Sequence, residues 1–438
     1  MTASSIRPLV ESMGPYLGQG GEGWNLVFFG DRGQIRIVSD EELPSMAEEQ
    51  LDGVDPASAI REPEECPQLS LLMNSRCNFK CSYCYAAQSR TDEELSIGRI
   101  MPLLEHWMSD PALRSDDELE ISFSGGGEPL LSMPEIEKTV SSALSLASKL
   151  EKKLRFSMAT NGSLLNGRIL DFLERHRFRL FYSFELLEDL QRRQRGVWQP
   201  VRDNLLKVLQ RDIPCTVKCV ITRLSMSRQL EMAECAVQEF PGLRRLTFNQ
   251  MELIARQCTI DEYREYLAEA IPGFFAARRF AARHGVSVSS YDFQRMSRRS
   301  CRCCPVPPVI APHGGITFCT AASSPREELY PFVSVGEISP SGGISIDEGR
   351  LELLKGYRAD RDPRCRQCAA RDFCGGGCPV ARHVYTPAQM QEYCRGRRRF
   401  LAFMVMEFVE SHFRDAGVTS MADWLAGKPP ADRRRFHL

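Results

Sequence analysis

Apolar residues along the chain fall into short runs separated by longer amphipathic stretches. The runs predict six strands, at residues 69–73, 119–123, 154–159, 178–184, 215–221 and 243–248. Stretches with apolar residues at helical spacing lie between them, at 136–149, 201–210, 227–239 and 261–283. Strands that alternate with helices favour a parallel sheet, with functional side chains at the carboxyl ends of the strands. We therefore predict an α/β fold in which six β/α units form a curled or open sheet.

The segments on either side of this region follow other patterns. Apolar runs at 24–29 and 35–38 flank a turn and lead into a helical pattern, which predicts a hairpin and a short helix. Prolines and acidic residues indicate a linker at 57–67. Residues 296–395 are dense in Cys, Gly and Pro, which indicates a loop-rich domain organised by metal. We divide the chain at 1–65, 66–290, 291–400 and 401–438, the last part being a C-terminal helix and tail.

Composition narrows the class of protein. The 438 residues include 56 Lys and Arg against 57 Asp and Glu, a formal net charge of -1, which gives no reason to expect binding to nucleic acid or to a membrane surface. Residues 1–18 show no signal-peptide pattern, and the apolar run at 400–409 is too short to span a bilayer. We expect a cytoplasmic location. In that reducing compartment, 17 cysteines indicate metal ligands more than disulfides.

Three cysteines follow the first predicted strand on one short loop. They are Cys77, Cys81 and Cys84, with Tyr83 directly before the last. Three thiolates hold three irons of a [4Fe–4S] cube and leave the fourth iron open to a ligand. An open metal position is typical of a reactive site, by the logic that separates catalytic from structural zinc. A zinc site or a loop of buried thiols is the alternative.

This motif and the strand ends that follow it resemble those of the radical S-adenosylmethionine (SAM) enzymes. The stretch 124–129, with sequence SGGGEP, follows the second predicted strand and is similar to the family's Gly-Gly-Glu-Pro element. The resemblance implies that Gly126, Gly127 and Glu128 receive the amino group of SAM. Glycines let a backbone approach its ligand, and a carboxylate complements an ammonium. An ordinary Gly-rich turn is the alternative.

The fourth predicted strand carries two further matches. Ser183 lies near its end and Arg195 follows twelve positions later. The resemblance implies that Ser183 contacts SAM, that Arg195 binds its carboxylate, and that Tyr83 flanks the adenine. Arg195 lies in the basic run 192–195, for which a solvated helix face is the alternative. Ordinary packing is the alternative for Tyr83.

A second group of cysteines is similar to the SPASM extension of radical SAM peptide maturases, which holds two auxiliary [4Fe–4S] clusters. By this resemblance the first cluster is held by Cys304, Cys319 and Cys378 with either Cys301 or Cys303. The second is held by four cysteines, Cys365, Cys368, Cys374 and Cys394. A pair of zinc sites is the alternative, because Cys-x2-Cys pairs also suit zinc.

The resemblance implies a partial (β/α)6 barrel of the TIM type with a C-terminal Cys-rich SPASM domain and a small N-terminal α+β module. It also implies reductive cleavage of SAM to a 5′-deoxyadenosyl radical, with a flavodoxin- or ferredoxin-type reductant. The radical would abstract hydrogen from a ribosomally made precursor peptide, to install a thioether or carbon–carbon cross-link. We expect the N-terminal hairpin to bind a leader segment at an exposed edge formed by 24–29 and 35–38.

Two other functions remain open. A sulfatase-type maturase would oxidise Ser or Cys to formylglycine, but Thr320 stands where those enzymes carry an aspartate base. A non-catalytic iron–sulfur or zinc scaffold, or an electron-transfer adaptor, is the second alternative. The complete set of three loop cysteines followed by Gly126, Gly127 and Glu128 argues against it. The sequence identifies no catalytic acid or base.

Overall fold

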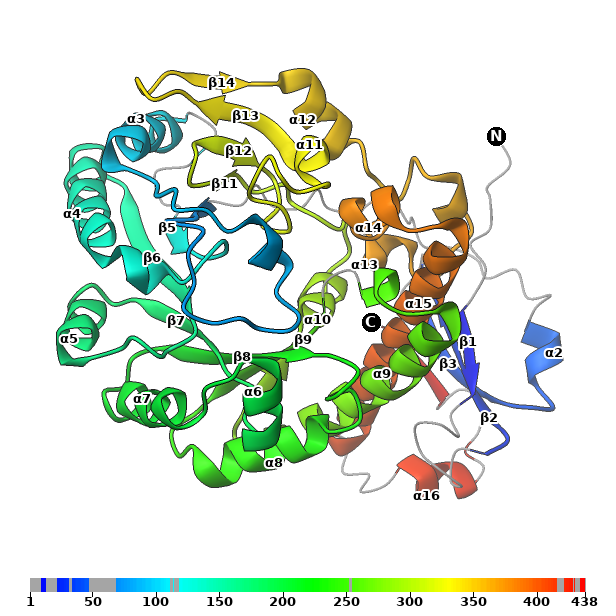
Figure 1. Cartoon of the computed structure of the whole chain (residues 1–438). Coiled ribbons are helices and arrows are strands. Elements are labelled where there is room, and N and C mark those ends of the chain that lie inside the picture. Colours follow the sequence, from blue (N-terminus) through cyan, green and yellow to red (C-terminus); the bar gives the residue numbers. More distant parts are fainter. Residues whose placement is uncertain are drawn as a thin grey trace.

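One long mixed sheet organises the molecule. The computed structural model describes residues 9–12, 22–30, 34–46, 68–110, 113, 118–251, 254–415, 421–427, 429 and 434–437. The sheet has eleven strands in the order β10-β9-β8-β7-β6-β5-β4-β11-β12-β13-β14. Its first eight strands, from β10 to β11, run parallel to their neighbours, and the last three are antiparallel. Figure 1 shows this sheet curling around an interior into which the loop after β4 projects.

All six predicted strands are present, so the prediction of an α/β fold with a partial barrel is confirmed. They are β4 (Gln68–Leu71), β5 (Glu118–Phe123), β6 (Lys153–Thr160), β7 (Arg179–Ser183), β8 (Cys215–Ile221) and β9 (Arg245–Gln250). A seventh parallel strand, β10 (Ser287–Ser289), pairs with β9 and was not predicted. It has three residues with one apolar side chain between two serines, too short a pattern to register as a strand.

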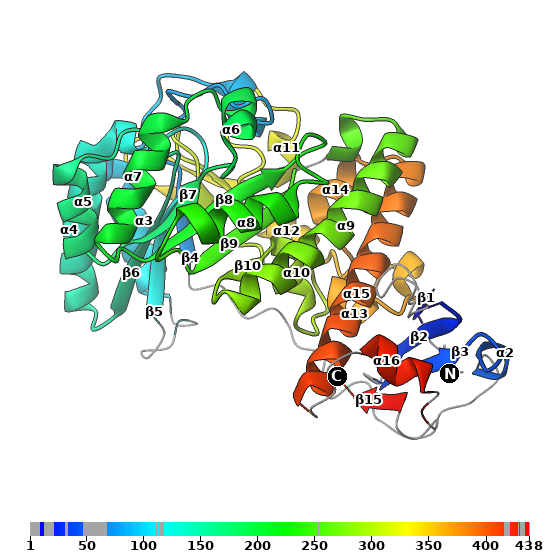
Figure 2. The same ribbon diagram turned by 90° about the horizontal axis from the view of Figure 1, so that it is seen from below.

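Helices cover the outer face of the parallel strands (Figure 1). They are α3 (Ile97–Met108), α4 (Met133–Lys149), α5 (Gly167–Arg175), α7 (Gln199–Gln210), α8 (Gln229–Glu239) and α9 (Ile260–Arg283). The short helix α6 (Glu188–Gln194) lies instead at the carboxyl ends of the strands, next to the loop after β4 (Figure 2). Three phenylalanines from the strand region, Phe123, Phe156 and Phe178, stack with ring centroids 5.3–6.4 Å apart. All three are buried, so this part of the core sits under the helical layer.

The Cys-rich region continues the barrel sheet. Strand β11 (Val309–Ile310) pairs in parallel with β4, and β12 (Gly315–Thr317), β13 (Ser334–Ile338) and β14 (Ile344–Ile346) follow as antiparallel neighbours. Its helices are short: α10 (Tyr291–Met296), α11 (Tyr330–Val333), α12 (Glu348–Lys355), α13 (Arg371–Cys374) and α14 (Pro379–Val384). Short 3₁₀ turns lie at Tyr85–Ser89, Pro129–Ser132, Ile254–Arg256 and Pro363–Cys365.

The last long helix, α15 (Pro387–Asp415), begins inside the Cys-rich region and passes the predicted boundary at residue 400. It packs against α9, where Phe403 stacks on Phe275 with a centroid distance of 5.3 Å. Among the described residues, no helix is long and apolar enough to cross a membrane.

The predicted N-terminal hairpin is confirmed. Strands β2 (Trp24–Phe29) and β3 (Gln34–Ser39) pair antiparallel, and the short helix α2 (Leu43–Met46) follows. They belong to a four-stranded sheet in the order β1-β2-β3-β15, in which β1 is Leu9–Ser12 and β15 is Arg435–His437. The C-terminal segment therefore lies beside the N-terminal module, together with α16 (Met421–Ala426), as Figure 2 shows. The linker predicted at 57–67 lies outside the described residues.

This sheet corrects one expectation. The edge proposed for 24–29 and 35–38 is not exposed, because β2 is paired with β1 and β3 is paired with β15. The C-terminal strand is fastened to β3 by Arg434, whose guanidinium donates to both oxygens of Glu42 at 2.6 Å and to the carbonyl oxygen of Ile37 at 3.0 Å. Phe436 packs on Phe413 of α15. The free edges of the described sheet are therefore β1 and β15.

Candidate functional site

The loop after β4 carries the first three predicted ligands at the carboxyl end of the sheet. The sulfurs of Cys77, Cys81 and Cys84 interact electrostatically with one another, and no disulfide joins them. Burial raises the pKa of the Cys77 and Cys81 thiols. The structure thus brings the three cysteines together. In the described part of the chain, no three Cys, His, Asp or Glu side chains converge closely enough for a single metal ion.

The glycine turn after β5 packs directly on this cysteine loop. The backbone N–H of Gly127 donates to the carbonyl of Asn74 at 2.8 Å, and that of Glu128 donates to the carbonyl of Arg76 at 2.7 Å. A Cβ on Gly127 would lie 1.8 Å from the Arg76 carbonyl oxygen, so only glycine permits this approach. Gly126 has φ +67, in the left-handed region that favours glycine. These glycines let the turn meet the cysteine loop itself.

The carboxylate of Glu128 joins the ends of two strands. It is 3% exposed and accepts hydrogen bonds from the Thr160 hydroxyl at 2.6 Å and the Asn161 backbone N–H at 2.8 Å. The Leu130 N–H donates to it at 3.3 Å. Burial raises the pKa of Glu128, and these donors act in the opposite direction. The carboxylate is held beside the cysteine loop, and its contact with an ammonium stays a prediction.

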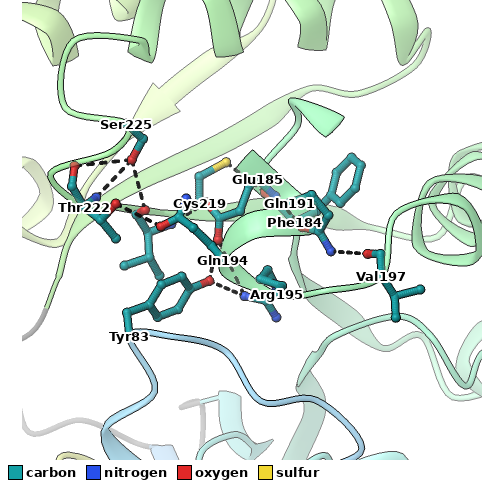
Figure 3. A network of polar contacts seen from close by, with 11 residues as sticks. Tyr83, Phe184, Glu185, Gln191, Gln194, Arg195, Val197, Cys219, Thr222 and Ser225 are labelled. Carbon is teal, nitrogen blue, oxygen red and sulfur yellow. Dashed lines mark hydrogen bonds and ion pairs between the residues drawn. The ribbon is translucent and has the colours of Figure 1, made fainter. Parts of the chain in front are cut away.

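Tyr83, Glu185 and Arg195 form a buried polar cluster on the other side of the loop (Figure 3). The Tyr83 hydroxyl donates to Glu185 Oε1 and accepts from Arg195 Nη1 at 2.5 Å. Arg195 Nη1 also lies 3.7 Å from Glu185 Oε1. Backbone bonding reinforces the contact, since Ser82 N–H donates to the carbonyl of Gln194 at 2.9 Å. The cysteine loop is therefore fastened on one side by the glycine turn and on the other by the end of α6.

Burial decides between the two interpretations of Arg195. Its residue is 9% exposed, whereas Arg192 and Arg193 of the same run are exposed, so the solvated-face alternative is wrong. Burial alone would lower the pKa of Arg195, but the charges of Tyr83, Cys81 and Glu185 raise it above its usual value. Its Nε is buried without a hydrogen-bond partner among the described residues. An orphaned guanidinium donor beside the cysteine loop fits a carboxylate ligand.

A cavity of about 1030 Å³ occupies the barrel interior. Its wall includes Gly125 and Ser183, from the side of the predicted SAM site, and Thr320 from the Cys-rich region. The two sides are close together, because a Cβ on Gly125 would lie 3.3 Å from Thr320 Cγ2. The wall also includes three of the cysteines assigned to the first auxiliary cluster, Cys304, Cys319 and Cys378. One predicted SAM contact, Ser183, and three predicted cluster ligands therefore line the same cavity.

The four cysteines assigned to the second auxiliary cluster also lie together. The Cys365 sulfur interacts with those of Cys374, Cys368 and Cys394. Cys365 ends the turn at 363–365, Cys368 lies between that turn and α13, and the other two belong to α13 and α15. Burial raises the pKa of Cys365 to about 12 and that of Cys374 to about 11. This set lies beside the N-terminal sheet, because Phe28 of β2 contacts Phe373 at a centroid distance of 5.7 Å.

Known proteins are similar to this chain in sequence and in fold. Residues 71–228 match the Radical SAM superfamily. Over these residues the chain is similar to the radical SAM enzymes. Radical SAM cyclopropyl synthase TigE of Paramaledivibacter caminithermalis is 24% identical over 169 residues, which are 36% of this chain and 34% of TigE. The matches to curated relatives span about a third of their length, 34% and 39%.

Solved structures extend the likeness over more of the chain. Native anSMEcpe with bound AdoMet has a TM-score of 0.62 at 17% identity, over 78% of this chain and 98% of that one. Streptococcus suis SuiB bound to precursor peptide SuiA has a TM-score of 0.52 at 13% identity, over 74% of each chain. At these identities the likeness shows a shared fold. The resemblance to radical SAM enzymes and the fold, both predicted from the sequence, are confirmed.

The choice between Cys301 and Cys303 gains one observation. Arg295 Nη1 donates to Cys303 Sγ at 3.6 Å. The charges of Cys303, Cys304 and Cys378 surround this guanidinium and raise its pKa. Cys303 therefore shares its cationic neighbour with two other ligands predicted for the first auxiliary cluster. Both cysteines are buried, and the prediction that Cys301 or Cys303 completes the set stays open, with this contact in favour of Cys303.

Two residues near the predicted SAM site were not assigned a role from the sequence. Glu185 is fully buried in the cluster of Figure 3, and its place directly after the strand that carries Ser183 was the available signal. Lys218 lines the cavity from β8. It is a lysine in an otherwise apolar or small-residue strand, and that break in the pattern was its signal. Arg397, in the basic run 395–399, is also buried: it is 4% exposed and pairs with Asp292.

Proposed function

We propose that this protein cleaves SAM reductively and abstracts hydrogen from a ribosomally made precursor peptide, to install a thioether or carbon–carbon cross-link. One observation carries the proposal: Gly125, Ser183 and Cys319 line the same cavity. A peptide residue in that cavity would lie between SAM and the first auxiliary cluster. About 1030 Å³ is enough for a few side chains and is in the range of ligand sites in proteins.

The residues of the chain would divide the work as follows. Cys77, Cys81 and Cys84 would hold a [4Fe–4S] cluster, and Arg195 would orient SAM by its carboxylate. This cluster with bound SAM supplies one-electron cleavage to a 5′-deoxyadenosyl radical. Tyr83 and the buried Glu185 would fix the Arg195 guanidinium, so that its free Nε points to one position. A guanidinium held this way loses little conformational freedom when it binds.

The auxiliary cysteines would serve the second half of the reaction. Cys304, Cys319 and Cys378, with Cys303 or Cys301, would hold a cluster in the wall of the cavity. A cluster there would accept an electron from the substrate radical or bind a substrate thiolate. The second set, at Cys365 and its partners, lies beside the N-terminal sheet and would pass these electrons toward the surface. There the oxidised form of the flavodoxin- or ferredoxin-type partner would accept them, and its reduced form would supply the electron that cleaves SAM.

Known proteins support a peptide substrate. SuiB was solved with its precursor peptide, and anSMEcpe was solved with AdoMet and the Cp18Cys peptide. TigE is named a cyclopropyl synthase, so the bond formed is not common to these proteins. Formylglycine formation is disfavoured because Thr320, which has no proton-accepting carboxylate, lies in the cavity wall where a base would be needed.

A leader segment would bind at the N-terminal sheet. Because β2 and β3 are both paired, the peptide would add to β1 or take the place of β15 beside β3. This sheet contacts the Cys-rich region through Phe28 and Phe373, so a leader held there would direct the following residues toward the barrel.

Mass spectrometry of a precursor peptide tests the proposal. A short Cys-, Thr- or Ser-rich peptide encoded beside this gene would be incubated anaerobically with reconstituted enzyme, SAM and dithionite. We expect the loss of two hydrogens and no fragment ions between the two linked residues. A hydrazine-reactive aldehyde at a single Ser or Cys would instead support formylglycine formation. An unmodified peptide with no SAM cleavage would support the scaffold alternative.

A further inference from the structure

The cavity wall has cations without carboxylate partners. Three of its basic residues, Arg179, Lys218 and Arg245, make no ion pair within the part of the chain that the structure describes. Two acidic residues also line the cavity, but both are engaged. Glu120 accepts from Arg155 at 2.7 Å and from the Ser157 hydroxyl at 2.6 Å, and Asp292 pairs with Arg397. The fourth basic residue, Arg295, faces the thiols of the first auxiliary set.

Lys218 stands at the level of the predicted SAM contact. In the parallel sheet Ser183 of β7 is the register partner of Lys218 on β8, and Thr247 of β9 is the partner of Lys218 on the other side. Ser289 of β10 continues the row next to Thr247. All four side chains line the cavity. A row of polar groups therefore crosses four neighbouring strands, and Lys218 is its one charged member.

Aromatic rings hold the Lys218 ammonium in place. Its Nζ lies 4.3 Å from the centroid of the Phe181 ring and 5.4 Å from that of Tyr291, and it donates to the Tyr291 hydroxyl at 3.2 Å. An ammonium has three donors, so two stay available to a ligand in the cavity. Cation–π contacts fix the position of the charge without neutralising it.

The other two cations mark a way in. Arg179 and Arg245 are exposed and are the first residues of β7 and β9, and Gln68 and Ser287 open β4 and β10 in the same wall. The cavity thus extends from the carboxyl ends of the strands, at Gly125 and Ser183, to their amino ends. Unpaired positive charge along such a passage raises the local concentration of anions.

From this arrangement we propose that Lys218 binds a carboxylate of the substrate, so that the peptide presents an Asp or Glu side chain next to the reacting residue. The inference rests on the proposed function in taking a peptide as the occupant. SAM carries a carboxylate of its own, which is the other source of this chemistry. We assign Lys218 to the peptide because Arg195, with its unpartnered Nε, is available to SAM.

Binding of two peptide pools distinguishes these sources. Short acetylated and amidated peptides of randomised sequence would carry a central Asp or Glu in one pool and Asn or Gln in the other. Each pool would be incubated with cluster-reconstituted, SAM-bound enzyme, and retained peptides would be quantified by mass spectrometry. SAM affinity would be measured in parallel by calorimetry. Neither measurement depends on SAM cleavage. If the protein formed no 5′-deoxyadenosine, the proposed function would be refuted, but the binding of the two peptide pools could still be compared.

We expect wild-type enzyme to favour the acidic pool by about tenfold, the scale of one charge-assisted hydrogen bond at a partly exposed site. Lys218→Met should abolish this preference, Lys218→Arg should keep part of it, and SAM affinity should stay within about twofold. Lys138→Met is the matched control, because Lys138 is exposed on α4, pairs with Glu135 and does not line the cavity. Its preference should equal that of wild type.

Two results would overturn the assignment. Weaker SAM binding in Lys218→Met with an unchanged acidic preference would mean that the lysine serves the carboxylate of SAM. An acidic preference that is absent in wild type, or that survives Lys218→Met, would mean that the ammonium is a structural part of the Phe181 and Tyr291 packing.

Discussion

Replacing Arg195 by Met separates its proposed role as a ligand from its role in the buried cluster. The side chain contributes an unpartnered Nε and an Nη1 that donates to the Tyr83 hydroxyl at 2.5 Å. A charge-assisted hydrogen bond to a carboxylate at a buried site contributes about 1.5–3 kcal/mol. Its loss should raise the dissociation constant for SAM by about 10- to 150-fold, since each 1.4 kcal/mol is tenfold.

The same substitution should also destabilise the fold. Glu185 would keep the Tyr83 hydroxyl and the Val220 N–H, which lies 3.2 Å from its Oε2. Burial already raises the pKa of Glu185, and only the charge of Arg195 and these donors oppose it. Without the guanidinium the pKa of this carboxyl should rise further, because burial would then be opposed by the hydrogen-bond donors alone. We expect a loss of about 1–3 kcal/mol in the free energy of unfolding, the usual cost of an unsatisfied buried group.

The double variant Arg195→Met/Glu185→Gln distinguishes the two effects. The Gln side chain carries no charge and keeps a hydrogen bond to Tyr83, so the double variant should regain most of the stability. It should not regain SAM affinity. Arg192→Met is the matched control, because Arg192 is exposed on the same helix and pairs with Glu188. That variant should bind SAM as tightly as wild type.

Anaerobic calorimetry on reconstituted protein gives the SAM affinities, and urea unfolding monitored by circular dichroism gives the stabilities. If the double variant bound SAM as tightly as wild type, Arg195 would act only by supporting the fold. If the single variant bound SAM normally, the guanidinium would not be a ligand at all.

Three further predictions follow from other parts of the molecule. Cys303→Ala should lose about four irons per chain and Cys301→Ala none, by iron analysis of the anaerobic protein; the reverse pattern would assign the first auxiliary cluster to Cys301. Burial raises the pKa of Cys215 to about 12, so the native thiol should resist alkylation at pH 8, and rapid labelling of the native protein would contradict this. Because the thiol of the unfolded chain ionises at lower pH than the native one, the free energy of unfolding should fall as pH rises from about 9 toward 12. Arg434→Met should release β15, seen as faster hydrogen exchange at 435–437 with exchange in the barrel unchanged; unaltered exchange there would show that Phe436 alone holds the strand.

Periodicity was sufficient to predict the barrel. Each predicted strand is a run of apolar residues that is buried under the helices in the structure. The spacing of apolar residues in strands and helices follows from the backbone geometry of each element, so it can be seen in the sequence without knowledge of long-range contacts. Strand β10 was not predicted, because its three residues become a strand only through pairing with β9. The C-terminal strand β15 was not predicted for the same reason, because its partner β3 is nearly 400 positions away in the sequence.

The candidate site was predictable where its residues follow one strand closely. Cys77, Cys81 and Cys84 share one loop, and the glycine turn follows the next strand in order. Side chains that meet across strands left weaker signals. Glu185 accepts a hydrogen bond from Tyr83, and Lys218 donates one to Tyr291, and both partners are distant in sequence. The charge state of such residues depends on burial, which the sequence does not display.

The central claim is that SAM is cleaved reductively at the loop cysteines, and formation of 5′-deoxyadenosine tests it directly. Reconstituted wild-type protein would be incubated with SAM and dithionite without oxygen, beside the variant Cys77→Ala/Cys81→Ala/Cys84→Ala, and the nucleoside would be quantified by liquid chromatography with mass spectrometry. Wild type should form it, and the variant should form none while retaining about eight of twelve irons, because the auxiliary ligands lie in another region of the chain. Equal nucleoside formation by the variant, or none by wild type, would contradict the account.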